Sequence, residues 1–243
     1  MKLLQLPALL VFSLAASVAV ADHHEMPKLN AEVHECTLKG NATLSDVLSF
    51  ARSEFSDWAE KSSLNLRTFI WEPVAVAPPY DQADLRWVNY FPSWGDYAKA
   101  NTAWRAPGSA DLSAKLLDMV DCKLPAFAQT YMFNRADTPL DEKTILLGKC
   151  SFKPGLRLTP ERLAATLKAQ DREGRTTGDL VESFWITSIG IEGEPWDFLR
   201  VTGGSAEAIA EMMDSGNGPD LSRMMANPFS CETDFHRSHT VHW

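Results

Sequence analysis

The sequence carries none of the common short catalytic motifs. It has no glycine-rich phosphate loop, no GxGxxG dinucleotide fingerprint, no GxSxG nucleophile elbow and no HExxH zinc motif. The nucleotide-binding proteins, hydrolases and zinc proteases that depend on these motifs are thereby excluded.

Basic residues are scarce as well. The 243-residue chain has 23 Lys and Arg against 32 Asp and Glu, a formal net charge of −9. A surface with this acidic excess repels the phosphates of nucleic acid and of anionic lipid, so neither is an expected partner.

Long apolar runs are confined to the first residues. Residues 1–21 combine Lys2, an apolar run and the small-residue cleavage site Ala19-Val20-Ala21, which is the pattern of a signal peptide; an uncleaved membrane anchor is the alternative. No cysteine follows the cleavage site, which argues against a bacterial lipid anchor, and no second run is long enough to span a bilayer. We therefore expect a soluble periplasmic or extracellular protein with no membrane contact once the signal peptide is removed.

Cysteine is rare too, and its four copies follow a pattern. They are Cys36, Cys122, Cys150 and Cys231, and no CxxC pair supports a metal site. The stretches DLSAKLLDMVDC (111–122) and DLSRMMANPFSC (220–231) both place a cysteine eleven residues after the aspartate. Export permits disulfide bonds, and four cysteines allow three pairings, all of which these residues leave open.

The shared spacing belongs to a longer internal repeat. A gapless shift of 114 residues aligns 36–71 with 150–185 at seven identical positions, among them Trp71 with Trp185. The shift falls to 111 and then 109 further along, as expected if the loops differ in length. Units of more than 100 residues are too long for a solenoid, so we interpret them as two domains, 22–137 and 144–243.

Both halves show the same predicted order of elements. A strand carries the first cysteine (AEVHECTLK and ILLGKCSFK), and a helix and two β-rich segments follow. Ser93 or Ser205 then begins a second helix, and the last strand reads AFAQTYMF or FHRSHTVHW. The order is βαββαβ, that of the ferredoxin-like sandwich, and the fold class is α+β.

With two such units, aromatic-rich strands and the passage NYFPSWGDYAKA before the second helix, the sequence resembles the dimeric α/β-barrel superfamily. This group includes antibiotic-biosynthesis-type monooxygenases and stress-responsive A/B-barrel proteins. The resemblance implies two tandem ferredoxin-like units that set their sheets face to face as an intramolecular pseudo-dimeric α/β barrel. It implies a fold more than a function.

The same fold selects among the disulfide pairings. Its first and last strands are antiparallel neighbours, so it implies the pairs Cys36–Cys122 and Cys150–Cys231. Each bond closes a loop of over 80 residues, which stabilises the fold by up to about 4–5 kcal/mol in the chain-entropy model.

Asymmetry between the halves gives a candidate site. In the last strand of the first half, one face carries the larger residues Phe127, Gln129, Tyr131 and Phe133, and we expect this face to line the barrel interior. The smaller residues of the other face would pack beneath helices. A shift of 109 carries the interior face onto His236, Ser238, Thr240 and His242.

We predict a ligand site formed by Arg200, His236 and His242, together with Trp87 and Asn89 of the third strand of the first half. Arg200 would hold an anion, and a histidine would act as an acid-base group or metal ligand. The alternative is a frayed terminal strand whose histidines face solvent. His34 either joins the site or lies on the surface, while the repeated Trp71 and Trp185 are predicted core residues.

Cleavage after Ala21 would expose Asp22, His23 and His24 at the new N-terminus. The free amine, two backbone amides and the imidazole at position three can hold Cu(II) or Ni(II) in a square plane. The alternative is a flexible polar tail.

Our leading hypothesis for function is an exported binding protein that holds a small, partly aromatic or anionic molecule in its barrel. The second is a cofactor-independent or haem-type monooxygenase or isomerase of the resembled superfamily. The third is a structural module whose barrel is filled by its own tryptophans. The sequence identifies no cofactor and does not decide whether the chain is an enzyme.

Overall fold

The structure, a computed structural model, describes residues 28–76, 83–134, 142–171, 180–189, 196–214 and 228–243. The first half forms β1 (Lys28–Leu38), β2 (Arg67–Ala75), β3 (Leu85–Phe91), β4 (Val120–Cys122) and β5 (Ala126–Asn134). Its helices are α1 (Leu44–Phe50), α2 (Ser56–Lys61), α3 (Trp94–Trp104) and α4 (Ala110–Met119), with a π-helical turn at Ala51–Phe55 and a 3-10 turn at Pro107–Ser109. The second half forms β6 (Glu142–Phe152), α5 (Pro160–Asp171), β7 (Val181–Ile189), β8 (Phe198–Gly204), α6 (Ala206–Met212) and β9 (Phe229–His242).

Short polar residues cap three of the described helices, and Ser93 and Ser205 do so where the sequence predicts a helix start. Thr43 caps α1 and exchanges hydrogen bonds with Asp46 in a capping box. Ser93 and Ser205 cap α3 and α6 through their side-chain oxygens. These oxygens accept hydrogen bonds from backbone amides that the first helical turn leaves without an intrahelical acceptor.

Eight strands close into an antiparallel barrel. The sheet runs β3-β2-β9-β6-β8-β7-β5-β1, the additional pairing of β3 with β1 closes the ring, and β4 adds to the end of β1. Each half contributes four strands, in the orders β5-β1-β3-β2 and β9-β6-β8-β7, and the pairs β2–β9 and β5–β7 join the halves. The predicted α+β class and the barrel are confirmed.

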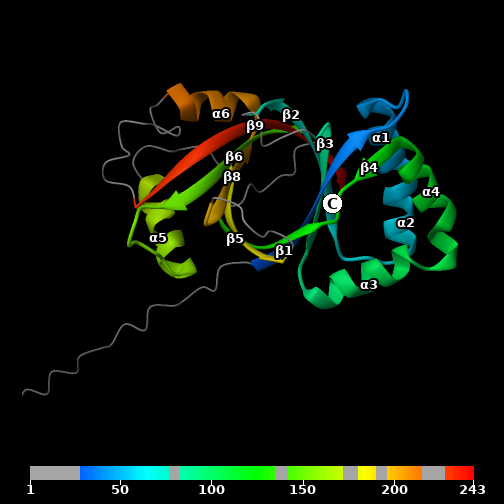
Figure 1. The fold of residues 1–243 in the computed structure, drawn as a ribbon, viewed down its shortest axis with the longest axis horizontal. Helices are drawn as coiled ribbons and strands as arrows, with labels where there is room; N and C mark the ends of the chain where they lie inside the picture. The colour runs from blue at the N-terminus through cyan, green and yellow to red at the C-terminus, as the bar shows by residue number, and fades with distance from the viewer. Residues whose placement is uncertain (1–27, 77–82, 135–141, 172–179, 190–195, 215–227) are drawn as a thin grey trace, which may run out of the picture.

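The helices lie outside the barrel on two opposite sides. Helices α1 to α4 cover the strands of the first half, and α5 and α6 lie at the far side (Figure 1). Three apolar cores fill the space between helices and sheet, one beneath α1 to α4, one beneath α5 and one beneath α6. Across the described ranges, every helix is too short or too polar to cross a bilayer.

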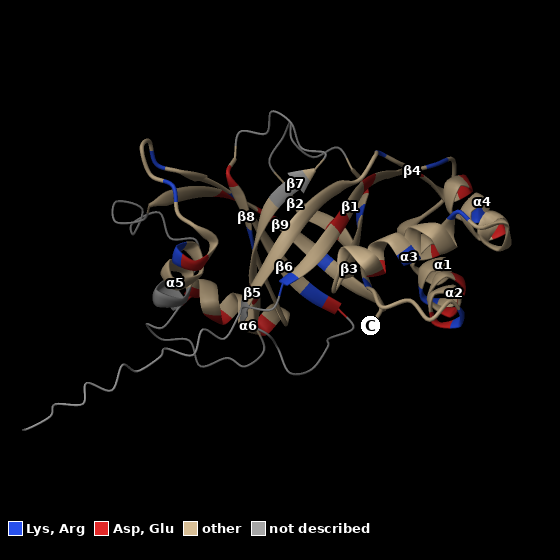
Figure 2. Cartoon of the chain, turned by 90° about the horizontal axis from the view of Figure 1, so that it is seen from below, with Lys and Arg blue, Asp and Glu red and all other residues tan. Residues whose placement is uncertain are grey.

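Charged residues of both signs are interspersed along the outer helices (Figure 2). Two ion pairs form there, Asp57–Lys61 at 3.8 Å and Glu54–Lys115 at 2.5 Å. Exposed pairs of this kind contribute less than about 1 kcal/mol each. Other charged side chains, such as Lys143 and Lys149, lie inside the barrel.

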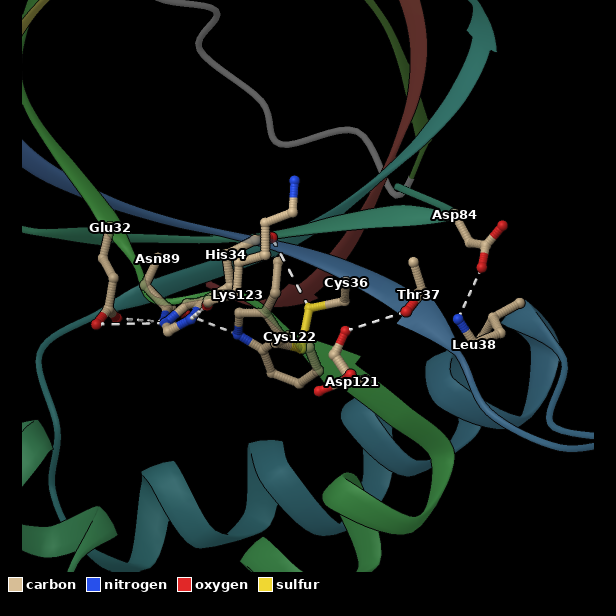
Figure 3. The surroundings of a disulfide bond; sticks show 11 residues. Glu32, His34, Cys36, Thr37, Leu38, Asp84, Asn89, Asp121, Cys122 and Lys123 are labelled. Atoms are coloured by element: carbon tan, nitrogen blue, oxygen red, sulfur yellow. Dashed lines mark hydrogen bonds and ion pairs between the residues drawn. A yellow bond between two sulfur atoms is a disulfide. The ribbon is translucent and has the colours of Figure 1, made fainter. Parts of the chain in front are cut away.

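Both disulfides implied by the fold are present, Cys36–Cys122 and Cys150–Cys231. Each joins residues that lie directly opposite each other on neighbouring antiparallel strands, β1 with β4 and β6 with β9. Figure 3 shows the first bond at the point where β4 meets β1. Because both bonds persist only in an oxidising environment, they favour a secreted or periplasmic location.

Two tryptophans fill the centre of the barrel. Trp71 and Trp185, each 2% exposed, face each other with ring centroids 5.5 Å apart, which confirms them as core residues. Their bulk explains why Ala31 and Ala128, directly opposed on β1 and β5, point inward. The predicted orientation of β5 was therefore wrong: the small residues face the interior, and Tyr131 packs outside with Phe184 beneath α5.

Candidate functional site

A cavity opens inside the barrel on one side of the central tryptophans. It lies where β2, β6 and β7 begin and where β3, β5, β8 and β9 end. The space open to the centre of a water molecule is about 70 Å³, several times the roughly 10–15 Å³ that a single water needs. An eight-stranded barrel is wide enough to be filled by side chains or to hold one small ligand, and here the cavity leaves room for a small ligand.

The walls of the cavity are mostly aromatic. Trp71 closes it towards the barrel centre, and Phe69, Tyr90 and Trp243 surround it. Phe69 meets Tyr90 and Trp243 edge-on at centroid distances of 5.7 and 5.8 Å. These geometries are favourable for aromatic pairs and present ring faces and edges to whatever occupies the cavity.

Two cations, Arg67 and Lys143, line the same cavity. The Arg67 guanidinium lies 4.3 Å from the centroid of the Trp243 ring, and the Lys143 ammonium lies 5.2 Å from it. Lys143 also lies 5.8 Å from the Phe69 centroid. No aspartate or glutamate is among the described residues that line the cavity. The site is therefore positively charged inside a protein that is acidic overall.

Lys143 is the most unusual group of the site. The residue is only 7% exposed, and within the described ranges its ammonium forms the two ring contacts but no ion pair with a carboxylate. Burial lowers the pKa of Lys143, and the positive charge of Arg67 lowers it further. Cation–π contacts replace only part of the hydration that the ammonium loses.

Hydroxyl groups complete the lining. The Oγ1 atom of Thr130 is buried and has no hydrogen-bond partner among the described residues, and the residue is 1% exposed. Ser183 accepts a hydrogen bond from the Trp185 indole at 3.2 Å. Burial raises the pKa of Tyr90 well above its ordinary value of 10.0, so its hydroxyl stays protonated. Thr130 and Tyr90 are thus hydrogen-bond donors available to a bound molecule.

The opposite end of the barrel carries charges that are paired. Arg86 donates a hydrogen bond to Nε2 of His236 and lies 3.6 Å from Glu35. The Lys149 ammonium lies 2.7 Å from the carboxylate of Asp234, whose side chain is 2% exposed. Ion pairs therefore fill this end of the barrel, whereas the described lining of the cavity end holds cations and no aspartate or glutamate side chain.

The structure does not bring the five predicted ligand residues together. His236 does lie inside the barrel, at 0% exposure. Its ring centroid is 6.1 Å from that of Trp71, and it lies on the side of Trp71 where Arg86 is, away from the cavity. Arg200 alternates with the inward-facing Leu199 and Val201 and so points outward, where it contacts Glu182 at 3.4 Å.

His242 is turned outward by an irregularity in β9. The register of β2 with β9 shifts between Thr68 and Phe69, so that Thr68 pairs with His242 while Phe69 pairs with Thr240. The extra residue reverses the alternation of side chains. His242 consequently forms a 3.0 Å contact with Ser56 of α2, and burial lowers the pKa of its imidazole.

Trp87 and Asn89 belong to the outer face of β3. Trp87 packs in the core beneath α1 to α4 and donates to Asn89 Oδ1 at 3.1 Å. The amide of Asn89 donates to Glu32 at 2.8 Å, and Glu32 lies 3.4 Å from His34 (Figure 3). This hydrogen-bonded network fixes the sheet below α3 and is separate from the cavity.

Asp22, His23 and His24, the predicted copper or nickel ligands, lie outside the described residues. Within the described ranges, no three His, Cys, Asp or Glu side chains gather in a way that could hold a metal ion.

Sequence reasoning missed Arg67 and Lys143. A usable indication existed: Arg67 and Phe69 share the strand face of Trp71, which was a predicted core residue, and alternation alone places them inward. The position of Lys143 beside Arg67 could not be predicted from alternation, because it depends on the sheet order, in which β2 and β6 are both neighbours of β9.

No protein-family model matches the chain, and no curated protein matches it. Among solved structures, a haem-binding protein from Thermus thermophilus is similar, with a TM-score of 0.51, 12% identity and coverage of 87% of this chain and 90% of the other. A chlorite dismutase from Candidatus Nitrospira defluvii in complex with imidazole has a TM-score of 0.51, 9% identity and coverage of 88% and 92%. At these identities the likeness concerns the fold alone: the chain shares its fold with these solved structures.

Proposed function

We propose that this protein is an exported small-molecule-binding protein whose barrel cavity holds a small anionic ligand with an aromatic or apolar body. One observation carries the proposal: a buried lysine, Lys143, lies beside Arg67 in a cavity whose described lining contains no aspartate or glutamate side chain.

An anion in the cavity would reduce the free-energy cost of burying the charged Lys143 side chain. Removing an ammonium from water without pairing it is unfavourable, and a second nearby cation increases the cost. A carboxylate placed between Arg67 and Lys143 would restore favourable charge-assisted hydrogen bonds. The ligand body would then contact the rings of Trp71, Tyr90 and Trp243.

Location and chain organisation fit this proposal. Residues 1–21 would direct export, and both disulfides suit an oxidising compartment. We also propose that the four-stranded halves are tandem ferredoxin-like units, 22–137 and 144–243, related by duplication. The corresponding strand orders of the halves support this view.

A haem-type function is suggested by the fold neighbours, but the cavity does not fit a haem. No described histidine lines it, and all four cysteines are in disulfides. The described histidines contact other groups: His34 contacts Glu32, His239 contacts Glu72, His242 contacts Ser56, and His236 accepts from Arg86. We therefore derive no haem chemistry for this site.

Calorimetry with matched carboxylate and amide pairs tests the proposal. Benzoate, phenylacetate and hexanoate should bind, whereas benzamide, phenylacetamide and hexanamide should bind far more weakly. Replacing Lys143→Met should weaken binding of the carboxylates roughly 10- to 150-fold, because a hydrogen bond to a charged group contributes about 1.5–3 kcal/mol.

The matched control is Lys123→Met, which removes a lysine whose side chain is 72% exposed at the other end of the barrel. It should leave carboxylate binding unchanged. Equal binding of acids and amides, or equal losses in the two variants, would contradict the proposal.

A further inference from the structure

We propose that Lys143 is a nucleophile that forms a reversible imine with small oxo acids held in the barrel cavity. The inference rests on the proposed function, because it uses the same cavity and the same anion-binding residues. It adds a covalent step that binding alone does not require.

The first argument is the state of the amine. A lysine attacks a carbonyl only as the neutral amine, and burial next to another cation is one way in which proteins favour that form. Lys143 meets both conditions, being 7% exposed and close enough to Arg67 for the two charges to repel. Arg67 from β2 and Tyr90 from β3 are the other residues with titratable side chains among the described lining residues.

The second argument is a contrast with Lys149 on the same strand. Lys149 forms a 2.7 Å ion pair with the buried carboxylate of Asp234. Lys143 has ring contacts in place of a carboxylate partner within the described residues. Two lysines of one strand thus have opposite electrostatic surroundings, and only Lys143 faces the cavity.

The third argument is the position of Arg67. Both cationic groups line the cavity and contact the Trp243 ring, at 4.3 and 5.2 Å from its centroid. A 2-oxo acid carries a carboxylate next to its carbonyl. The Arg67 guanidinium would hold the carboxylate through its planar donors, which leaves the carbonyl carbon for the Lys143 amine.

The step is balanced without an oxidant or reductant. The nitrogen lone pair of Lys143 forms a bond to the carbonyl carbon, and the carbonyl oxygen takes up a proton. Loss of the resulting hydroxyl as water then gives the C=N bond, and the two protons of that water balance the two protons that the amine nitrogen gives up. Thr130, whose Oγ1 lacks a hydrogen-bond partner in the described residues, and the protonated Tyr90 hydroxyl are the groups of the cavity that can donate to that oxygen.

Reductive trapping tests the inference. The full-length mature protein is incubated with pyruvate or phenylglyoxylate at neutral pH in the presence of cyanoborohydride, and the adduct is located by peptide mapping. We expect labelling of Lys143 to be at least about tenfold faster than labelling of Lys61, whose side chain is 80% exposed, since each unit of lower pKa gives about ten times more neutral amine.

Two further measurements separate this inference from the proposed function. Lys143→Met should lose the rapid adduct, while Lys61 in the same variant should be labelled as slowly as in the parent protein. In the parent protein, benzoate should protect Lys143 from labelling.

If benzoate binds in a Lys143-dependent way and no adduct forms at Lys143, the nucleophile is excluded and the binding function stands. If labelling is equal at Lys143 and Lys61, the nucleophile is likewise excluded. If neither binding nor labelling depends on Lys143, both proposals fail.

Discussion

The two ends of the barrel interior use the same kinds of residue for opposite purposes. At one end Lys149 is paired with Asp234, and Arg86 lies between His236 and Glu35. At the other end Lys143 and Arg67 contact aromatic rings, and no aspartate or glutamate side chain is among the described lining residues. At the first end the buried charges neutralise one another, whereas at the second end the cations and aromatic rings form a site that can bind an anionic ligand.

The largest effect should follow from breaking the pair at the closed end. Lys149→Met leaves the buried Asp234 carboxylate without this cation, and removal of one partner of a buried pair destabilises by about 3–5 kcal/mol. Urea denaturation should show this loss in the free energy of unfolding. Lys143→Met is the matched variant and should show no such loss. Similar destabilisation by both variants would remove the distinction between the ends.

A smaller effect is expected from narrowing the cavity. A Cβ added at Gly203 would lie 2.7 Å from Cδ1 of Ile145, another lining residue. Gly203→Ala should therefore push Ile145 into the cavity, weaken carboxylate binding and destabilise the fold by about 1–3 kcal/mol, the usual cost of overpacking.

Gly148→Ala is the control for this substitution. Its Cβ would meet its nearest neighbours at 3.4 to 3.6 Å, which is ordinary contact, on the outer face near Cys150 and Arg200. It should alter carboxylate binding little. If Gly203→Ala binds carboxylates like the parent protein, the cavity does not set the size of the ligand.

The smallest effect concerns pH. Because the pKa of Lys143 is lowered in the folded protein relative to its ordinary value of 10.5, the unfolded chain binds more protons between the two values. The free energy of unfolding should therefore rise as the pH increases through the lowered pKa towards 10.5, and the cost of the buried charge is fully present below that window. Unfolding curves across this range should lose this rise in Lys143→Met. An unchanged pH dependence in the variant would show that Lys143 does not titrate as its surroundings require.

The general architecture could be predicted because it depends on local and repeated features. The alternation within strands, the serine caps before α3 and α6, and the repeated cysteine spacing predicted the α+β class. The barrel and the two disulfide pairs were implied by the resemblance to the dimeric α/β-barrel superfamily. The central position of Trp71 and Trp185 followed from their recurrence at matching places in the two halves.

The candidate site could not be predicted in the same way, because one residue of register reverses a strand face. In the first half Ala31 of β1 pairs with Ala128 of β5, and in the second half Ile145 of β6 pairs with His236 of β9. Ala128 therefore corresponds to His236, which is a shift of 108 residues between the last strands and not 109. The error in the shift and the inverted face of β5 compensated each other, so His236 was placed inside for incorrect reasons. Arg200 had no such compensation, and the irregularity near Thr240 turned His242 outward.

The most direct test of the central claim is the pKa of Lys143 measured by NMR titration of its side-chain εCH₂ signals, with and without saturating benzoate. The account predicts a pKa below the ordinary value of 10.5 in the free protein and an upward shift when benzoate binds, because the carboxylate stabilises the ammonium. A Lys143 pKa that is ordinary in the free protein, or that benzoate leaves unchanged, would contradict the assignment of this cavity as an anion-binding site.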